Sequence, residues 1–245
     1  MKLKLNKTDI VDNFLNPVSK VTDKCIINLS EDLIYTLTNN SDETIILYSV
    51  YKSTNPLPNK EVHKLNVPDV KRLCRVFDCI NEDVVEFDIN SNNIEYTSDD
   101  VKFTYHLLED GIIQNGLVST DKIKSLAFDC SFNLKETKLA ELLKGSSFAS
   151  GSNKIYFSTR DKKVFAELTD KNIQNVDSIS YLVSDSYTGA DLVDILPMNL
   201  EIIRTFSGLK FKDIVVKINT KLKVLMFEIN NSNCTMKYIV SALVK

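Results

Sequence analysis

The most constraining feature of this sequence is a pattern that occurs four times: an extended run, a short amphipathic helix, and then strands of alternating polar and apolar residues. The four expected helices begin at residues 9, 69, 138 and 199. Internal repetition constrains the whole fold, so it outweighs any local motif. A single β-α-β-β-β unit cannot bury both the apolar stripe of its helix and the apolar face of its sheet. Pairs of units can bury both, so four units predict two similar domains.

Apolar spacing and capping residues predict the limits of the helices at 9–15, 69–77, 138–144 and 199–206. Asn6 or Thr8 can cap the first helix, and Pro17 is expected to help end it. The other expected limits are Asn66 as the cap and Pro68 in the first turn of the second helix, Gly145 at the end of the third, and Pro197 and Gly208 at the start and end of the fourth.

Alternating runs between turn residues predict the strands. They are expected at 2–5, 24–29, 33–38, 44–50, 84–89, 94–97, 101–108, 127–133, 154–158, 164–169, 178–184, 190–196, 213–218, 224–229 and 235–244. The pattern lapses between the second and third units, so domains are expected at 1–110 and 127–245 with a linker at 111–126. The predicted fold class is α+β: two similar domains of mostly antiparallel sheet with helices grouped on one face.

Composition excludes several classes of function. Five cysteines at irregular spacing argue against a disulfide framework, and with only two histidines no zinc constellation is expected. We expect no cofactor. The first residues lack the apolar run of a signal peptide, and no stretch approaches the roughly 18 apolar residues of a membrane span. We therefore expect a soluble, cytoplasmic protein.

The net charge of −3 makes the chain as a whole a poor candidate for nucleic-acid binding, but the local field decides. Basic residues recur on or beside the helices, whereas the acids gather in turns and strands. Exposed helix faces are charged in most proteins, so the simpler interpretation is a solvated surface for each residue taken alone. Recurrence on several helices favours a phosphate-contacting surface. The candidates are Lys7, Lys20, Lys71, Arg72, Arg75, Lys135, Lys138, Lys144, Arg204, Lys210 and Lys212.

The fourfold series, the two domains, the linker and the basic helices resemble the DNA polymerase sliding clamps. The most clamp-like stretches are residues 67–77 (VPDVKRLCRVF) and 138–144 (KLAELLK), each followed by an alternating strand. The chain looks most similar to the processivity factors of tailed phages, which are related in architecture to proliferating cell nuclear antigen. It departs from that pattern in its first helix, where Asp9 and Asp12 stand in place of a basic inner face.

The resemblance implies a ring of three identical chains that encircles duplex DNA, tethers a replicative polymerase and slides without reading sequence. It also implies a clamp-loader ATPase, because this chain has no phosphate-binding loop, and it implies no catalysis. The strand at 101–108 would pair with a neighbour's strand at 178–184, because head-to-tail pairing that closes leaves no free sheet edge. The implied subunit interface contains Val101, Phe103, Tyr105, Leu107, Ile179, Tyr181 and Val183.

The resemblance further implies that client proteins insert a short apolar peptide beside the linker and the C-terminal strand. This pocket maps to Leu117, Val118, Ile123, Leu243 and Val244, which could equally be ordinary core or linker residues.

Two other classes of function stay open. An enzyme would need a catalytic arrangement around His63 or His106, yet no nucleophile motif lies near either, and the paired acids fall in turns. A viral structural or assembly protein of repeated β-rich domains would share the edge pairing. It would not need basic residues collected on helices.

Overall fold

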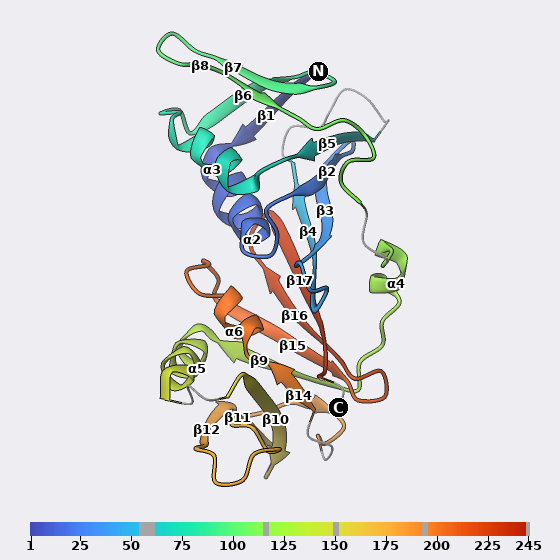
Figure 1. Cartoon of the computed structure of the whole chain (residues 1–245), viewed down its shortest axis with the longest axis vertical. Coiled ribbons are helices and arrows are strands. Elements are labelled where there is room, and N and C mark those ends of the chain that lie inside the picture. Colours follow the sequence, from blue (N-terminus) through green and yellow to red (C-terminus); the bar gives the residue numbers. More distant parts are fainter. Residues whose placement is uncertain (54–61, 115–117, 149–151, 193–195, 244–245) are drawn as a thin grey trace. The chain divides into compact units, whose positions relative to one another are not determined.

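The computed structural model describes all residues except 54–61, 115–117, 149–151, 193–195 and 244–245. The chain divides into two compact units (Figure 1). Unit 1 contains Met1–Ile123 together with Asn230–Met236, and unit 2 contains Lys124–Ile229 with Lys237–Lys245. The domain limits expected from the sequence, with a linker at 111–126, stay a prediction.

The predicted fourfold repeat is present as an order of elements. Four times along the chain a helix or helical segment is preceded by a strand and followed by three, and the short helix α4 and strand β13 are additions to this series. The pairing shows how two repeats complete each other. In both units the first strand of one repeat joins the three strands of the other repeat, which explains why one repeat alone leaves apolar surface uncovered.

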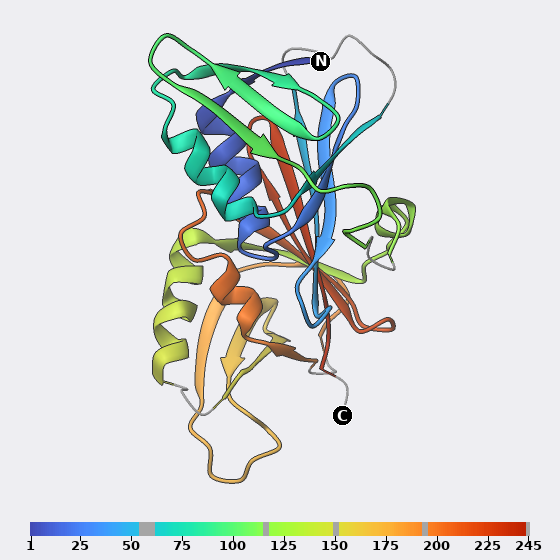
Figure 2. The same cartoon turned by 45° about the horizontal axis from the view of Figure 1, so that its top comes forward.

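Unit 1 has two antiparallel layers of strands. One has the order β1-β6-β7-β8, formed by β1 (Lys2–Asn6), β6 (Val84–Ile89), β7 (Asn93–Thr97) and β8 (Lys102–His106). The other has the order β4-β3-β2-β5, formed by β2 (Cys25–Leu29), β3 (Leu33–Asn39), β4 (Ile45–Lys52) and β5 (His63–Val67). Figure 2 shows the β6, β7 and β8 layer turned toward the viewer. Strict alternation of buried and half-buried residues along β3 and β4 fixes their register, Leu37 opposite Tyr48.

The first helical segment of unit 1 runs from Lys7 to Ser19 as α1 (Lys7–Ile10), a π-helical turn η1 (Val11–Leu15) and α2 (Asn16–Ser19). Asn6 caps it as predicted: its side-chain oxygen accepts from the Asp9 N–H at 2.9 Å. The prediction that Pro17 helps end the helix was wrong, because the helix continues through it. The preceding turn is π-helical, and Pro17 lies in the first turn of α2, where proline is tolerated.

The second helix, α3 (Val70–Asp78), begins later than predicted. Asp69, not Asn66, is its cap: the Asp69 carboxylate accepts from the Arg72 N–H at 2.8 Å. Asn66 lies in β5, and its amide donates to the Leu108 carbonyl and to the Asp110 carboxylate. The Asn66 prediction was wrong because this tertiary partner outweighed its local capping preference. A short helix, α4 (Thr120–Lys124), spans the point where the chain passes from unit 1 to unit 2.

Unit 2 repeats this arrangement. The order β12-β11-β10-β14 contains β10 (Lys154–Arg160), β11 (Lys163–Leu168), β12 (Ile179–Ser184) and β14 (Pro197–Asn199). The order β13-β9-β15-β16-β17 contains β9 (Cys130–Lys135), β13 (Thr188–Gly189), β15 (Asp213–Asn219), β16 (Val224–Asn230) and β17 (Cys234–Ser241). The predicted strand at 190–196 was wrong for the residues described there: the strands nearby are β13 and β14.

Two helices pack in unit 2, α5 (Glu136–Phe148) and α6 (Glu201–Thr205). Gly145 does not end α5 as predicted but lies inside it. An added Cβ at Gly145 would stand 2.6 Å from the Tyr181 ring, so a larger residue here would require that ring to move. Pro197 was also misplaced by the prediction, since it lies in β14 and pairs with Tyr156 of β10. Gly208 follows α6 with a positive φ of 77°, as expected for a residue just past a helix end.

Each unit has its own apolar core. In unit 1, Phe14, Leu15 and Val18 of the first helical segment are buried, and Phe77 of α3 packs edge-on against Phe87 of β6. In unit 2, Phe206 packs against Phe227 and Tyr238. Mostly antiparallel sheets with a few short helices confirm the predicted α+β class.

Candidate nucleic-acid interface and assembly edges

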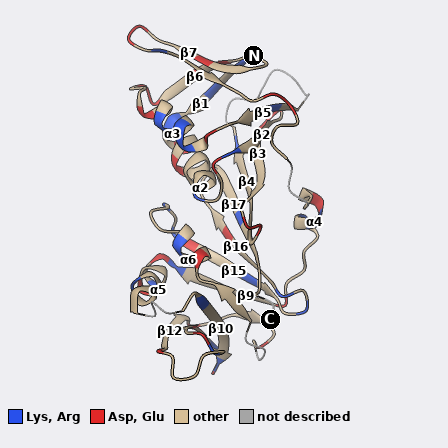
Figure 3. Cartoon of the chain, viewed as in Figure 1, with Lys and Arg blue, Asp and Glu red and all other residues tan. Residues whose placement is uncertain are grey.

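Helix α3 carries the clearest basic face among the described helices. Its cap at Asp69 and its buried stripe of Val70, Leu73, Cys74 and Phe77 fix which side faces the core. The opposite side exposes three basic residues against one acid, Asp78, and Figure 3 shows this helix as a block of blue. The three exposed bases are Lys71, Arg72 and Arg75. A row of cations on one helix is suited to contact phosphates without reading bases.

One cation of α3 has an internal partner. The Lys71 ammonium lies 3.0 Å from the Asp23 carboxylate, and both side chains are more than half exposed. An exposed ion pair of this kind contributes little stability, so Lys71 can exchange Asp23 for a phosphate at small cost.

The other predicted basic positions are exposed or half-buried, and two of them pair with an acid on their own helix. On α5, Lys138 pairs with Glu141 at 2.9 Å while Lys144 is exposed, and on α6 Arg204 pairs with Glu201 at 3.3 Å. Lys7 donates to the Ile80 carbonyl at 2.7 Å, which holds it against unit 1. The remaining predicted positions, all exposed, are Lys20, Lys135, Lys210 and Lys212. The structure thus favours α3 over the other helices as a phosphate-contacting element.

The predicted subunit-interface strand β8 lies at the edge of its sheet, with β7 on one side only among the described residues. Two hydrogen bonds lie just beyond the two ends of the β7–β8 ladder. At one end the Leu107 N–H donates to the Asn92 carbonyl, and at the other the Ser98 N–H donates to the Val101 carbonyl. Because hydrogen-bonded pairs alternate in an antiparallel ladder, the N–H and carbonyl of Thr104 face the open edge. This edge can accept another strand.

The side chains of β8 divide between core and edge. Tyr105 is 4% exposed, and its hydroxyl donates to the Asp69 carbonyl at 2.7 Å. Burial raises the pKa of Tyr105 to about 12. Phe103 is half-buried and stacks on Tyr96 with ring centres 5.5 Å apart. Val101 and Leu107, which flank β8 in the sequence, are also half-buried.

Strand β12 of unit 2 is likewise an edge strand among the described residues, paired only with β11. Val183 is buried in the unit, whereas Ile179 and Tyr181 are half-buried. The structure therefore gives both predicted partner strands a free edge. It holds one chain, so their pairing with each other stays a prediction.

The predicted client pocket cannot be assembled from the described residues. Leu117 and Val244 lie outside them. Val118 is half-buried and Ile123 is 3% exposed in unit 1, while Leu243 is half-buried in unit 2 and donates its N–H to the Pro197 carbonyl. This assignment stays a prediction.

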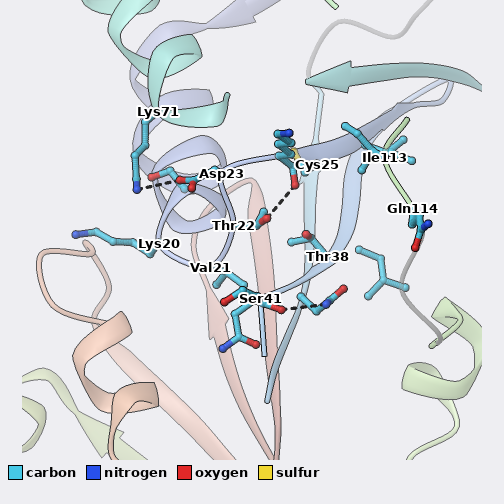
Figure 4. Close-up of a pocket in the computed structure, with 16 residues that line it drawn as sticks. Lys20, Val21, Thr22, Asp23, Cys25, Thr38, Ser41, Lys71, Ile113 and Gln114 are labelled. Atoms are coloured by element: carbon cyan, nitrogen blue, oxygen red, sulfur yellow. Dashed lines mark hydrogen bonds and ion pairs between the residues drawn. The ribbon is translucent and has the colours of Figure 1, made fainter. Parts of the chain in front are cut away.

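A cavity of about 550 Å³ in unit 1 was missed by the sequence analysis. It is lined by the end of the first helical segment, by β2, by β3 and its following turn, and by Ile113 and Gln114. Figure 4 shows Lys20 and Lys71 on one side of it and Ile113 and Gln114 on the other. Its wall combines segments far apart in sequence, so no local signal could have revealed it.

Among the described residues, no group of three or more His, Cys, Asp or Glu side chains could hold a metal ion. Within that same part of the chain, no helix is both long enough and apolar enough to cross a membrane.

No family model matches this sequence, and neither does any curated protein. Solved structures do match its fold. A. fulgidus PCNA, solved with the C-terminal region of FEN-1 bound, superposes with a TM-score of 0.78 over 100% of this chain and 98% of that chain, at 10% identity. PCNA from Entamoeba histolytica gives 0.75 over 99% and 98%, at 15% identity. This chain has the PCNA-type sliding-clamp fold.

A third sliding clamp agrees: the PCNA2–PCNA3 complex from Sulfolobus tokodaii gives a TM-score of 0.74 over 99% of both chains, at 13% identity. The match over the whole length confirms the predicted clamp-type domains. At these identities the likeness is one of fold, and a closer relation to the processivity factors of tailed phages stays a prediction.

Proposed function

We propose that this protein is a DNA polymerase processivity factor: a ring that encircles duplex DNA, tethers the replicative polymerase and slides without sequence specificity. The observation that carries this proposal is the full-length match to sliding clamps. The fold supports a binding and tethering role, so we propose no catalytic activity.

Ring closure in this proposal uses the free edges of β8 and β12. Three chains of two domains each pair head to tail, so that β8 of one chain adds to β12 of the next and every edge is satisfied. The outward N–H and carbonyl of Thr104 support this role for β8.

DNA contact in this proposal is carried mainly by α3. Topological linkage provides retention, so the cations need only centre the duplex. Weak, salt-screened phosphate contacts that do not read bases allow sliding. The acids elsewhere in a chain of net charge −3 disfavour adhesion of DNA to other surfaces.

Two partners besides DNA and the polymerase follow from this function. A closed ring must be opened to admit DNA, and we propose that a separate clamp-loader ATPase does so. We place client peptides beside the linker, at Val118, Ile123 and Leu243 with Leu117 and Val244. If the protein is viral, as the phage resemblance implies, it would act in the cytoplasm of the host.

Light scattering across protein concentration tests the assembly first. The closed trimer requires a species three times the chain mass of 27.8 kDa. A monomer that persists at tens of micromolar would contradict the ring. No observation in the structure favours the alternative of a structural or assembly protein.

Replacing the three cations of α3 tests the DNA-facing role. We expect K71A/R72A/R75A to retain the trimer mass and to lose most of the polymerase stimulation given by the loaded ring. The matched control is K162A/K163A, two lysines at the β10–β11 turn, which should leave stimulation unchanged. Full stimulation by the α3 variant would exclude this helix as the DNA-contacting element while leaving the ring itself untouched.

A further inference from the structure

Part of unit 1 comes from a segment near the C-terminal end of the chain. Residues Asn230–Met236, which form the turn between β16 and β17 and the start of β17, belong to unit 1 although both strands continue into unit 2. In the strand order, β17 lies beside β4, as Figure 1 shows. The Lys52 N–H at the end of β4 donates to the Asn233 carbonyl at 2.7 Å.

The side chains of this segment bind the first helical segment of unit 1. Asn231 donates through its amide to the Asn13 side-chain oxygen at 2.8 Å, and the Asn233 amide donates to the Asp9 carboxylate at 3.2 Å. The Cys234 thiol donates to the Asn13 backbone carbonyl, with sulfur and oxygen 2.8 Å apart. Three successive contacts therefore hold one turn of chain against one turn of helix.

The helix presents an unusual acceptor at this place. In a regular α-helix the Asn13 carbonyl would accept from the N–H of residue 17, but Pro17 has no N–H. The turn Val11–Leu15 is π-helical, with the Asn16 N–H bonded to the Val11 carbonyl five residues earlier. π-Helical turns are rare and often mark functional places in helices.

The contacts of this segment with the first helical segment are partly buried, so losing one of them is costly. Cys234 is 2% exposed and Tyr51 beside it on β4 is 1% exposed, so water does not replace a lost partner easily. Burial also raises the pKa of Cys234 to about 12, so the thiol keeps its proton and remains a donor.

We propose that residues 231–234 form a detachable strap, and that the π-helical turn with Pro17 is its socket. Docking of the strap gives the Lys52 N–H at the end of β4 its acceptor and ties the first helical segment to the start of β17. Pro17 has no N–H that could restore the α-helical bond to the Asn13 carbonyl, which here accepts from the Cys234 thiol. Release of the strap frees the Lys52 N–H at the end of β4 without unfolding the β3–β4 pairing.

Hydrogen exchange at single amides tests the strap in the full-length protein. The Lys52 amide reports docking, and the amides through which β4 pairs with β3 report the integrity of the unit. In Pro17→Ala the new N–H competes for the Asn13 carbonyl, and in Cys234→Val the thiol donor is removed. We expect exchange at Lys52 to rise tenfold or more in both variants while the β3-paired amides change less than twofold.

Two matched variants control for general effects. Pro68→Ala changes a proline of unit 1 outside the strap, and Cys25→Val changes a buried thiol of the same unit. Both should leave Lys52 protected, and Cys234→Ser, which retains a hydroxyl donor, should protect Lys52 better than Cys234→Val. Unchanged protection of Lys52 in both strap variants would overturn the proposal. Equal acceleration of all β4 amides would overturn it too, since the strap would then not detach separately.

Thiol labelling gives a second readout that does not depend on amide assignment. Cys79 is exposed and should react first in every variant, whereas Cys234 should react only when the strap opens. We expect Pro17→Ala to raise the labelling rate of Cys234 at least tenfold relative to Cys79. An unchanged ratio would contradict the role given to Pro17.

Discussion

Both the backbone conformation and the lack of space around Gly189 in β13 favour glycine at this position. Its φ is 95°, and an added Cβ would stand 1.9 Å from the Asp129 carbonyl oxygen of the neighbouring segment. We expect Gly189→Ala to lower the free energy of unfolding by about 2–4 kcal/mol, from the left-handed backbone and the forced shift together. Gly208→Ala is the matched control, because Gly208 has φ 77° but open space around it.

Urea denaturation of the two variants separates these terms. Gly208→Ala should cost only about 1 kcal/mol, the penalty of a positive φ in a residue with a side chain. Equal losses in the two variants would show that the chain beside Gly189 relaxes freely.

An ion pair in unit 2 predicts a pH dependence. The Lys154 ammonium lies 2.8 Å from both carboxylate oxygens of Asp170, and this hydrogen bonding, with a further N–H from Asn172, holds the pKa of Asp170 below its usual value. A lowered pKa means that the carboxylate stabilises the folded state above the ordinary pKa of about 3.9 and ceases to do so as pH falls through the folded-state value.

Asp170→Asn should therefore unfold at a lower urea concentration than wild type at pH 7, and the difference should shrink below about pH 4. The exposed Asp185, changed to Asn, is the control and should follow wild type throughout. A gap between Asp170→Asn and wild type that stays constant down to pH 2.5 would contradict the linkage.

At the scale of elements, the start of α3 is set by Asp69, whose carboxylate accepts from the Arg72 N–H. We expect Asp69→Ala to cost about 1 kcal/mol of stability, whereas Asp69→Ser, which can still cap, should cost clearly less. Urea unfolding monitored by circular dichroism measures both. Equal losses for the two variants would contradict a capping role for the Asp69 side chain, because the contacts of residue 69 with the Tyr105 hydroxyl use backbone atoms that both variants keep.

Elements with a local signature could be predicted from the sequence, and those that depend on partners could not. The strands of unit 1 and the stripe Val70, Leu73, Cys74 and Phe77 follow from periodicity alone. The cap of α3 was misassigned because Asn66 finds its partners at Leu108 and Asp110, about forty residues away. Gly145 was misread as a helix end because its constraint is the Tyr181 ring on another element.

The candidate site divides in the same way. The position of the α3 cations on the side opposite the buried stripe could be predicted, because the helical periodicity places both the apolar and the basic residues. The ion pairs on α5 and α6, such as Arg204 with Glu201, could not be predicted in the same way. They depend on the conformations of the side chains, which the sequence pattern does not specify. The exchange of first strands between repeats is a long-range pairing, so a sequence pattern predicts its strands but not their neighbours.

At the scale of the whole molecule, the edge of β8 offers a direct test of assembly. Thr104→Pro removes an N–H that faces outward and leaves the β7–β8 ladder intact, because proline is tolerated at an edge. We expect this variant to remain folded but to give the mass of a single chain in light scattering, whereas Thr104→Ala should retain the trimer mass. A trimer of Thr104→Pro would show that β8 is not the joining strand.

The return of residues 230–236 to unit 1 has a consequence during synthesis on the ribosome. Residues 1–123 emerge well before the segment that completes them, because all of 124–229 is translated in between. At typical rates of about 5–20 residues per second, that interval lasts roughly 5–20 s. Throughout it β4 lacks its outer neighbour, so each nascent chain displays an open strand to the other chains on the same message. Pairing between those unfinished chains competes with correct folding until the last hairpin arrives.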